Sequence, residues 1–219
     1  MERFLAPTGP YGRVLRPGDV KEPTSIAYVQ CAGSRDETLG ITYCSRVCCM
    51  YAVKQAMLLT GALPMAEITI YYMDIRTFGK GYEQFYQSAK AMGVEFVRGK
   101  VASIKEDPDQ NPIIKVEMTD TGEIVERTHD LVVLSQGIVP ASHPTVSLPL
   151  GFDNFISVPA PDSAPCVTER PGIFVTGTAM GPMDIVDSII SASAAAAEAS
   201  AYIRENGNRL NVPQEAAYA

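Results

Sequence analysis

The 219-residue chain has the composition of a folded globular protein, with 46% hydrophobic and 20% charged residues. Its formal net charge of -7 argues against nucleic acid as the main partner, because phosphate binding needs clustered Lys and Arg. The first residues contain no apolar core of a secretory signal, and the longest apolar helical stretch carries Asp187 and Glu198. We therefore expect a cytoplasmic protein with no direct membrane insertion.

Strands and helices alternate in the first half of the sequence. Residues 1–24 are rich in Pro, Gly and charge and predict an extended lead-in. Alternating β-branched residues predict strands, and apolar residues at helical spacing predict helices that end at Gly61 and Gly93. The predicted elements are a strand over 25–31, a helix over 45–60, a strand over 67–75 and a helix over 79–93.

The second half begins with a strand over 94–99, and short antiparallel strands over 101–107, 113–119 and 123–130 follow. The apolar run over 130–140 is typical of a buried parallel strand. This order of elements predicts an α/β, Rossmann-like nucleotide-binding domain. The order is strand, helix, strand, helix, strand, meander and returning strand. A Pro-rich connection then leads to three further predicted features: a strand over 172–177, a long helix over 185–203 and a flexible tail over 206–219.

Four cysteines gather at the end of the first strand and the start of the first helix. Cys31, Cys44, Cys48 and Cys49 have the spacing C-x12-C-x3-C-C. Thiols stay reduced in the cytosol, so such a group there more often binds metal or does redox chemistry than forms disulfides. Core packing is the alternative for any single cysteine, and it is our interpretation of the isolated Cys166.

Four thiolates suit either Zn²⁺ or an iron–sulfur cluster. Adjacent residues of a helix point about 100° apart. Cys48 and Cys49 can therefore reach two corners of a [4Fe–4S] cube more easily than two positions around one small ion. The start of the helix also supplies N–H groups and a positive dipole end, which favour thiolates.

A nucleotide-binding fingerprint is missing from the first turn. A dinucleotide fold carries G-x-G-x-x-G there, so that the backbone can approach the pyrophosphate. This chain has AGSRDETLGITYCSRVCC after the strand instead. The sequence thus places sulfur ligands where a nicotinamide cofactor would lie, which argues against NAD(P)H binding.

Five segments together resemble the flavin-bearing A subunit of heterodisulfide reductase and its relatives. They read YVQCAGSRDE…YCSRVCCMYAVKQA, YYMDIRTFGKGYEQFY, GVEFVRGKVASI, DLVVLSQGIVP and GIFVTGTAMGP. The similarity runs from about Pro7 to Arg204. It implies the C-terminal part of a thioredoxin-reductase-like core, in which a degenerate NAD(P)-type domain over 25–137 carries a [4Fe–4S] cluster. Residues 138–205 would form the C-terminal half of an FAD-binding domain.

The resemblance also implies particular ligands. Cys31, Cys44, Cys48 and Cys49 would bind the cluster, and FAD would meet the turn before the last helix and one glycine at the domain crossing. The expected FAD contacts are Gly137, Gly177, Thr178, Gly181, Pro182, Met183, Asp184 and Ile185. No residue is assigned a catalytic role, since His129 and His143 have no paired base in the sequence pattern.

The sequence therefore predicts an electron-transfer subunit of a heterodisulfide-reductase-like complex, an oxidoreductase that relays single electrons between FAD and the cluster. No unit with a G-x-G-x-x-G motif for FAD, and no ferredoxin-type cysteine run, occurs in these residues. We expect the FAD to be shared with a partner chain that supplies the N-terminal FAD-binding unit, and iron–sulfur subunits to be further partners. Two alternatives remain open: an assembly module with structural zinc, and a self-sufficient flavin-dependent NAD(P)H oxidoreductase.

Overall fold

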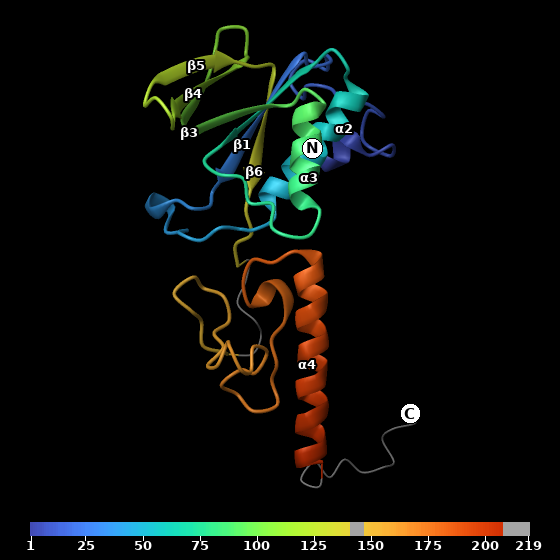
Figure 1. Cartoon of the computed structure of the whole chain (residues 1–219), viewed down its shortest axis with the longest axis vertical. Coiled ribbons are helices and arrows are strands. Elements are labelled where there is room, and N and C mark those ends of the chain that lie inside the picture. The colour runs from blue at the N-terminus through green and yellow to red at the C-terminus, as the bar shows by residue number, and fades with distance from the viewer. Residues whose placement is uncertain (141–146, 208–219) are drawn as a thin grey trace. The chain divides into compact units, whose positions relative to one another are not determined.

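The computed structural model describes residues 1–140 and 147–207. The chain divides into two compact units, Met1–Gly137 and Ile138–Ala219, which are described separately below (Figure 1). No helix among the described residues is both long and apolar enough to cross a membrane. His143 and most of the predicted flexible tail, from residue 208 onward, lie outside the described residues.

The first unit is built on a six-stranded sheet with the order β5-β4-β3-β2-β1-β6. The central strand β1 pairs in parallel with both β2 and β6, and five of its residues in a row are buried. Burial on both faces is typical of a parallel strand in an α/β fold. The strands are β1 (Ser25–Ala32), β2 (Glu67–Tyr72), β3 (Glu95–Glu106), β4 (Pro112–Met118), β5 (Ile124–Thr128) and β6 (Leu131–Gln136).

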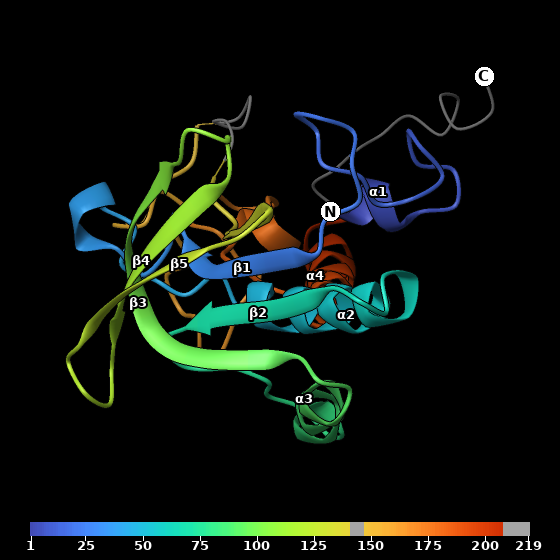
Figure 2. The ribbon, with the colours of Figure 1, turned by 90° about the horizontal axis from the view of Figure 1, so that it is seen from above.

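Helices cover one face of this sheet. Tyr28 and Ile70 of the sheet pack there with Val53 of one helix and Tyr86 of another. The opposite face has its own small core around Tyr71, beneath the strands of the meander. Figure 2 shows the meander strands curling away from the helices. The helices of this unit are α1 (Glu2–Leu5), α2 (Cys48–Ala62) and α3 (Tyr82–Ala91).

One prediction is wrong in the middle of the sheet, where we expected separate strands over 94–99 and 101–107. The structure has the single strand β3, which pairs in parallel with β2 and then antiparallel with β4 (Figure 2). At Gly99 a Cβ atom would lie 2.6 Å from the carbonyl oxygen of Glu117. The glycine therefore permits a close backbone approach, and a register shift between Val101 and Ser103 follows it.

The bounds of the first long helix also differ from the prediction. Arg46 has a left-handed φ of 65°, which is incompatible with a right-handed helix, so α2 begins at Cys48 rather than at Ser45. Gly61 is not the C-cap but lies inside the helix, which continues to Ala62. Pro64 disfavours helical geometry at the residue before it, and α2 ends there.

The second unit contains the 22-residue helix α4 (Ile185–Asn206) and little other regular structure. The prediction of a strand over 172–177 is wrong. Within this segment only Phe174 forms a bridge, an isolated one with Val167 outside it. A short 3-10 helix, η2 (Gly177–Ala179), follows it. An apolar segment becomes a strand only beside a suitable neighbour, and the described part of this unit offers none.

Candidate functional site

The four cysteines come from three places that meet at the carboxyl end of β1. Cys31 lies near the end of that strand, Cys44 lies in the following loop, and Cys48 and Cys49 are the first two residues of α2. All four are free thiols. In an open α/β sheet, ligands bind beyond the carboxyl ends of the strands, at the point where the strand order reverses. The strand β1, between β2 and the returning β6, is that point here.

Each of the four thiols lies close enough to others to influence their protonation. Burial raises the pKa of Cys31, and the nearby thiols of Cys48 and Cys44 raise it further. A hydrogen bond with Cys49 and burial raise the pKa of Cys48. The pKa of Cys49 is lowered, first by its hydrogen bond with Cys48, while Cys31 and Cys44 act against this change. The four thiols thus lie within electrostatic range of others in the set, and their role as ligands of one bound group stays a prediction.

Backbone N–H groups point at the sulfur atoms. The N–H of Arg46 donates to Cys44 Sγ at 3.3 Å, and N–H groups at the start of α2 favour the thiolate of Cys48. The N–H of Arg76 likewise lowers the pKa of Cys49. Such donors stabilise negative charge on sulfur, whether it belongs to a thiolate or to a bound anionic group.

The backbone around the cysteines is strained. Three of the six non-glycine residues with positive φ in the described chain are Cys31 (58°), Arg35 (55°) and Arg46 (65°). Each costs of the order of 1–2 kcal/mol, and such residues concentrate at functional sites. The pairing of β1 with β6 also shifts register between Val29 and Ala32. The strand is therefore irregular at Cys31.

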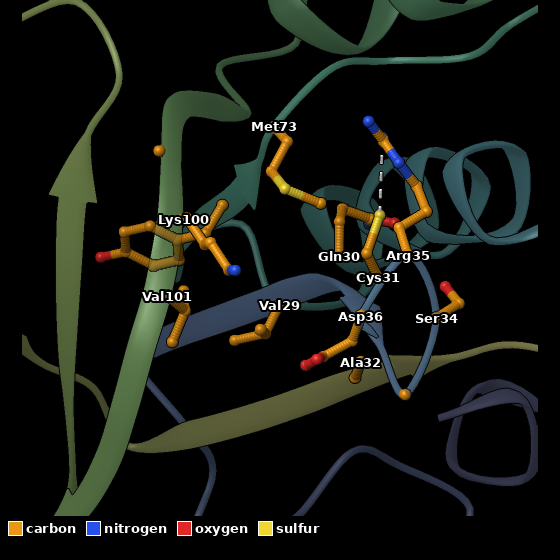
Figure 3. Close-up of a pocket in the computed structure, with 13 residues that line it drawn as sticks. Val29, Gln30, Cys31, Ala32, Ser34, Arg35, Asp36, Met73, Lys100 and Val101 are labelled. Carbon is orange, nitrogen blue, oxygen red and sulfur yellow. Dashed lines mark hydrogen bonds between the residues drawn. The ribbon is translucent and has the colours of Figure 1, made fainter. Parts of the chain in front are cut away.

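An ion pair closes one side of the site. Arg35 donates from both terminal nitrogens to Asp74, at 2.6 and 2.9 Å, and Arg76 donates to the same carboxylate at 3.1 Å. The Arg35 guanidinium also reaches Cys31 Sγ at 3.9 Å, as the dashed line in Figure 3 marks. The two arginines hold the pKa of Asp74 below its usual value, although burial acts in the opposite direction. Nothing in the sequence pattern pointed to this pairing of residues 35 and 74.

A small pocket lies beside Cys31, and Arg35 also lines it. It has a volume of about 160 Å³ and is lined by residues at the ends of β1 and β2 and in the middle of β3. Lys100, Met73 and Asp36 are drawn around it in Figure 3. Cofactor pockets usually have volumes of about 300–1,000 Å³, so this pocket is smaller than a usual cofactor site. The first turn supplies no dinucleotide loop here either, since fifteen residues, 33–47, separate β1 from α2.

Among the described residues, no three His, Cys, Asp or Glu side chains are arranged to hold a single metal ion. The ligands of Zn²⁺ all lie within about 2.3 Å of one ion, whereas a [4Fe–4S] cube binds each thiolate at a different iron atom. The donor set, with four thiols and backbone donors around them, fits a cluster.

The predicted FAD contacts fall in two places. Gly137 is the last residue of the first unit, where an added Cβ would lie 2.8 Å from Ser45 Cβ and 3.3 Å from Ser34 Cβ. The other seven lie between η2 and the start of α4. There the N–H of Gly177, which has a φ of 62°, donates to Ser191 Oγ at 3.0 Å, and Asp184 caps α4 by accepting from the N–H of Asp187 at 2.8 Å. The turn before α4 is therefore held by hydrogen bonds to the helix that follows it.

The fold is similar to that of thioredoxin reductases. The structure of the Lactococcus lactis enzyme matches 84% of this chain and 54% of its own, with a TM-score of 0.55 and 19% identity. The structure of the T. acidophilum enzyme matches 84% of this chain and 53% of its own, with a TM-score of 0.52 and 16% identity. These matches confirm the predicted α/β, thioredoxin-reductase-type fold. No family model matches the chain.

Curated proteins match almost the whole chain. The A subunit of the H(2):CoB-CoM heterodisulfide,ferredoxin reductase from Methanothermobacter thermautotrophicus is 42% identical over 207 residues, which are 91% of this chain and 31% of that protein. The second iron-sulfur A subunit of the CoB--CoM heterodisulfide reductase from Methanopyrus kandleri is 46% identical over 208 residues, 91% of this chain and 32% of that protein. The corresponding iron-sulfur A subunit from Methanocaldococcus jannaschii is 44% identical over 220 residues, 97% of this chain and 34% of that protein.

The chain thus spans about a third of the length of the curated relatives that it matches. Identities above 40% over nine-tenths of a chain are far beyond what fold similarity alone produces. We conclude that the chain belongs to the family of heterodisulfide reductase A subunits and corresponds to one part of such a protein.

Proposed function

We propose that this chain is the electron-transfer part of a heterodisulfide-reductase-like complex, with a [4Fe–4S] cluster held by Cys31, Cys44, Cys48 and Cys49. The observation that carries the proposal is the gathering of these thiols at the strand-to-helix junction where related folds bind a nucleotide. A bound cluster would supply one-electron transfer. The iron-sulfur name of the Methanopyrus relative supports the same cofactor.

In this proposal the chain's own residues position and shield the cluster. Cys48 and Cys49 are almost fully buried, so two of the four ligands are held away from water. The Arg35–Asp74 pair keeps a cation beside Cys31, where it offsets the negative charge of thiolates. Four protein ligands leave no position for a substrate, which favours electron relay over substrate activation.

We further propose that FAD contacts the segment from Gly177 to the start of α4. In this segment Gly177, Thr178, Gly181, Pro182, Met183, Asp184 and Ile185 would lie against the flavin, and Gly137 would lie at the crossing between the two units. The positive end of the α4 dipole would stabilise negative charge on a reduced flavin. The match to the flavin-type thioredoxin reductase fold supports this assignment.

The FAD site is completed, in this proposal, by a βαβ unit outside these 219 residues. Only Ala195 is buried in the whole of α4, and the first two turns expose Ile185, Val186, Ile189 and Ile190 by 55–79%. A helix with such an apolar face normally packs on a sheet. The thioredoxin reductases that share the fold are about twice as long as the matched region, so their remaining half is the kind of surface that fits.

The names of the relatives suggest the kind of partner. Their names describe subunits of reductases, including ferredoxin-dependent ones. We propose that this chain likewise works beside iron–sulfur subunits of a larger complex, in the cytoplasm. The terminal substrate belongs to that complex and is not assigned to this chain.

The two alternatives make different demands on the site. Structural zinc needs four side chains around one ion, and adjacent helix residues such as Cys48 and Cys49, which point about 100° apart, suit that arrangement poorly. A self-sufficient NAD(P)H oxidoreductase needs a phosphate-binding turn, whose place is taken by the long loop after β1. The cluster proposal needs the four thiolates to gather around one cube, where each can bind a different iron atom, and it needs no phosphate-binding turn.

Anaerobic purification followed by cofactor analysis tests the proposal. We expect about four iron and four sulfide per chain, with broad visible absorption and an electron paramagnetic resonance signal after reduction. Cys48→Ala should remove most of the iron, whereas Cys166→Ala, a matched buried cysteine in the other unit, should leave it unchanged. Iron-free protein, zinc at one per chain, or bleaching by NAD(P)H would refute the proposal.

A further inference from the structure

Two serine hydroxyls are buried beside the cysteines without any hydrogen-bond partner. Ser45 is fully buried and follows Cys44 in the chain, and Ser34 is 2% exposed and lies three residues after Cys31. Neither Oγ atom has a partner in the structure. Folded proteins satisfy the great majority of their buried polar atoms, so unpaired hydroxyls at one place need an explanation.

The two serines belong to one small space, although they lie on different parts of the loop. Both side chains pack against Gly137, where an added Cβ would overlap Ser45 Oγ and lie 3.3 Å from Ser34 Cβ. The backbone holds each serine in place: the N–H of Ser34 donates to the carbonyl of Cys31 at 3.2 Å, and the carbonyl of Ser45 accepts from Val47 at 2.8 Å. Both side chains are therefore held against Gly137, on the loop that carries Cys44 and follows Cys31, and no cysteine sulfur accepts from either hydroxyl in the cluster-free chain.

The surroundings show what kind of group the hydroxyls can meet. No protein atom accepts from either hydroxyl, and each serine lies within three residues of a cysteine that we propose as a cluster ligand. The sulfur atoms of an iron–sulfur cluster accept hydrogen bonds from nearby donors, and such bonds adjust its reduction potential. A hydroxyl can rotate to donate, and a buried one without a partner is available to do so.

Resting on the proposed function, we infer that Ser34 and Ser45 are positioning residues that donate hydrogen bonds to the sulfur atoms of the cluster site and raise its reduction potential. A donor stabilises the additional negative charge of the reduced state more than the oxidised state. Gly137 is required because any side chain there would displace Ser45. The same hydroxyls remain unsatisfied in the cluster-free chain, where their burial without a partner lowers the free energy of unfolding or leaves it unchanged.

Redox titration of the cluster signal in Ser34→Ala and Ser45→Ala tests the inference on the purified anaerobic protein. We expect a more negative midpoint potential in each variant and a larger shift in the double variant. Ser34→Thr keeps a hydroxyl and should restore the wild-type potential. Thr69→Val removes a buried hydroxyl that is bonded to Glu95 instead, so it should leave the potential unchanged.

The unfolding midpoint of the cluster-free variants separates the inferred role from a purely structural one. If the serines only stabilised the fold, their removal would lower this midpoint. Ser34→Ala and Ser45→Ala should leave the unfolding midpoint unchanged or raise it, because each removes an unpaired buried hydroxyl. A lowered midpoint together with an unchanged potential would show that the serines serve the fold alone, and would overturn the inference. Wild-type protein without iron would overturn the cluster assignment and, with it, this inference; an intact cluster with unaltered potentials would overturn the inference only.

Discussion

Arg35 and Asp74 join the turn after β1 to the chain that leaves β2 by two hydrogen bonds of 2.6 and 2.9 Å. The thiol of Cys49 also lies 4.0 Å from the carbonyl oxygen of Asp74. Asp74 thus contacts both the loop that follows Cys31 and the thiol of Cys49. The pair is a structural link across the site and not only a surface contact.

Arg35→Gln should loosen this link more than it destabilises the fold. Both side chains are partly exposed, so we expect the free energy of unfolding to fall by about 1 kcal/mol or less. Loss of iron to a chelator, followed by visible absorption, should become several-fold faster, because the covering segment is no longer held.

Arg127→Gln is the matched control for this prediction. Arg127 pairs with Glu95 at 2.8 and 3.0 Å, with a comparable partial exposure, between β5 and the start of β3. It should cost similar stability without changing the rate of iron loss. Equal rates of iron loss in the two variants would contradict the role given to Arg35.

Gly137→Ala and Gly61→Ala should have opposite effects on stability. A Cβ at Gly137 would lie 2.8 Å from Ser45 Cβ, so we expect overpacking to cost about 1–3 kcal/mol. At Gly61, inside α2, a Cβ meets nothing within 4 Å, and alanine should stabilise the helix by about 0.5–1 kcal/mol. Urea unfolding of the cluster-free chain measures both changes.

A second substitution identifies the cause of the loss at Gly137. Ser45→Gly removes the atoms that the new methyl group would strike, so the double variant Gly137→Ala/Ser45→Gly should recover part of the stability. Additive losses in the double variant would show that the two positions do not interact.

The sequence predicted that Cys31 lies at the end of a strand and Cys48 and Cys49 near the start of a helix, but it gave little about their surroundings. The role of the cysteines as cluster ligands stays a prediction. The placement of the cysteines can be read from short stretches of sequence, because Cys31 lies near the end of a strand and Cys48 begins the helix that follows. Both therefore lie at the carboxyl end of β1. The contact of Gly137 with Ser45 joins residues far apart in the chain, and no local pattern marks it. Likewise, the strand β3 could not be distinguished from two strands, because its continuity depends on which neighbours pair with it.

His129 should make the free energy of unfolding fall as the pH falls below about 6.5, the ordinary pKa of histidine. Burial lowers its pKa below the ordinary 6.5, and its ring bonds Ser25 Oγ and Tyr71 Oη, each at 2.8 Å. Below about pH 6.5 the unfolded chain therefore binds more protons than the folded chain, so stability falls as the pH falls. The slope is at most about 1.4 kcal/mol per pH unit, until the folded protein also takes up the proton.

Urea unfolding of the cluster-free chain at several pH values measures this dependence. His129→Asn should be less stable at pH 7.5 and should lose most of the slope. Asp130 and Glu95 have lowered pKa values, so their contributions are lost only at more acidic pH, below their ordinary values of 3.8 and 4.5. A slope that persists unchanged in the variant would assign the effect to other groups.

The exposed apolar face of α4 should bind the flavin-binding βαβ unit that lies outside this chain. Ile189 is 61% exposed on the second turn, between Ile185 and Ile190. Ile189→Lys places a charge in the proposed interface, which should weaken binding by about tenfold or more, since a buried isoleucine contributes about 1.5–3 kcal/mol. Co-expression with the tagged flavin-binding region of a curated relative, followed by measurement of co-elution and bound FAD, provides the assay.

The control for this prediction is Leu58→Lys, which adds the same charge at an exposed apolar residue of α2. Leu58 is 47% exposed and lies in the other unit. It should leave both co-elution and FAD content at the wild-type level, because α2 already packs on its own sheet. If the two lysine variants retain FAD equally, the face of α4 does not form the contact, and the apolar residues of its first two turns need a different partner.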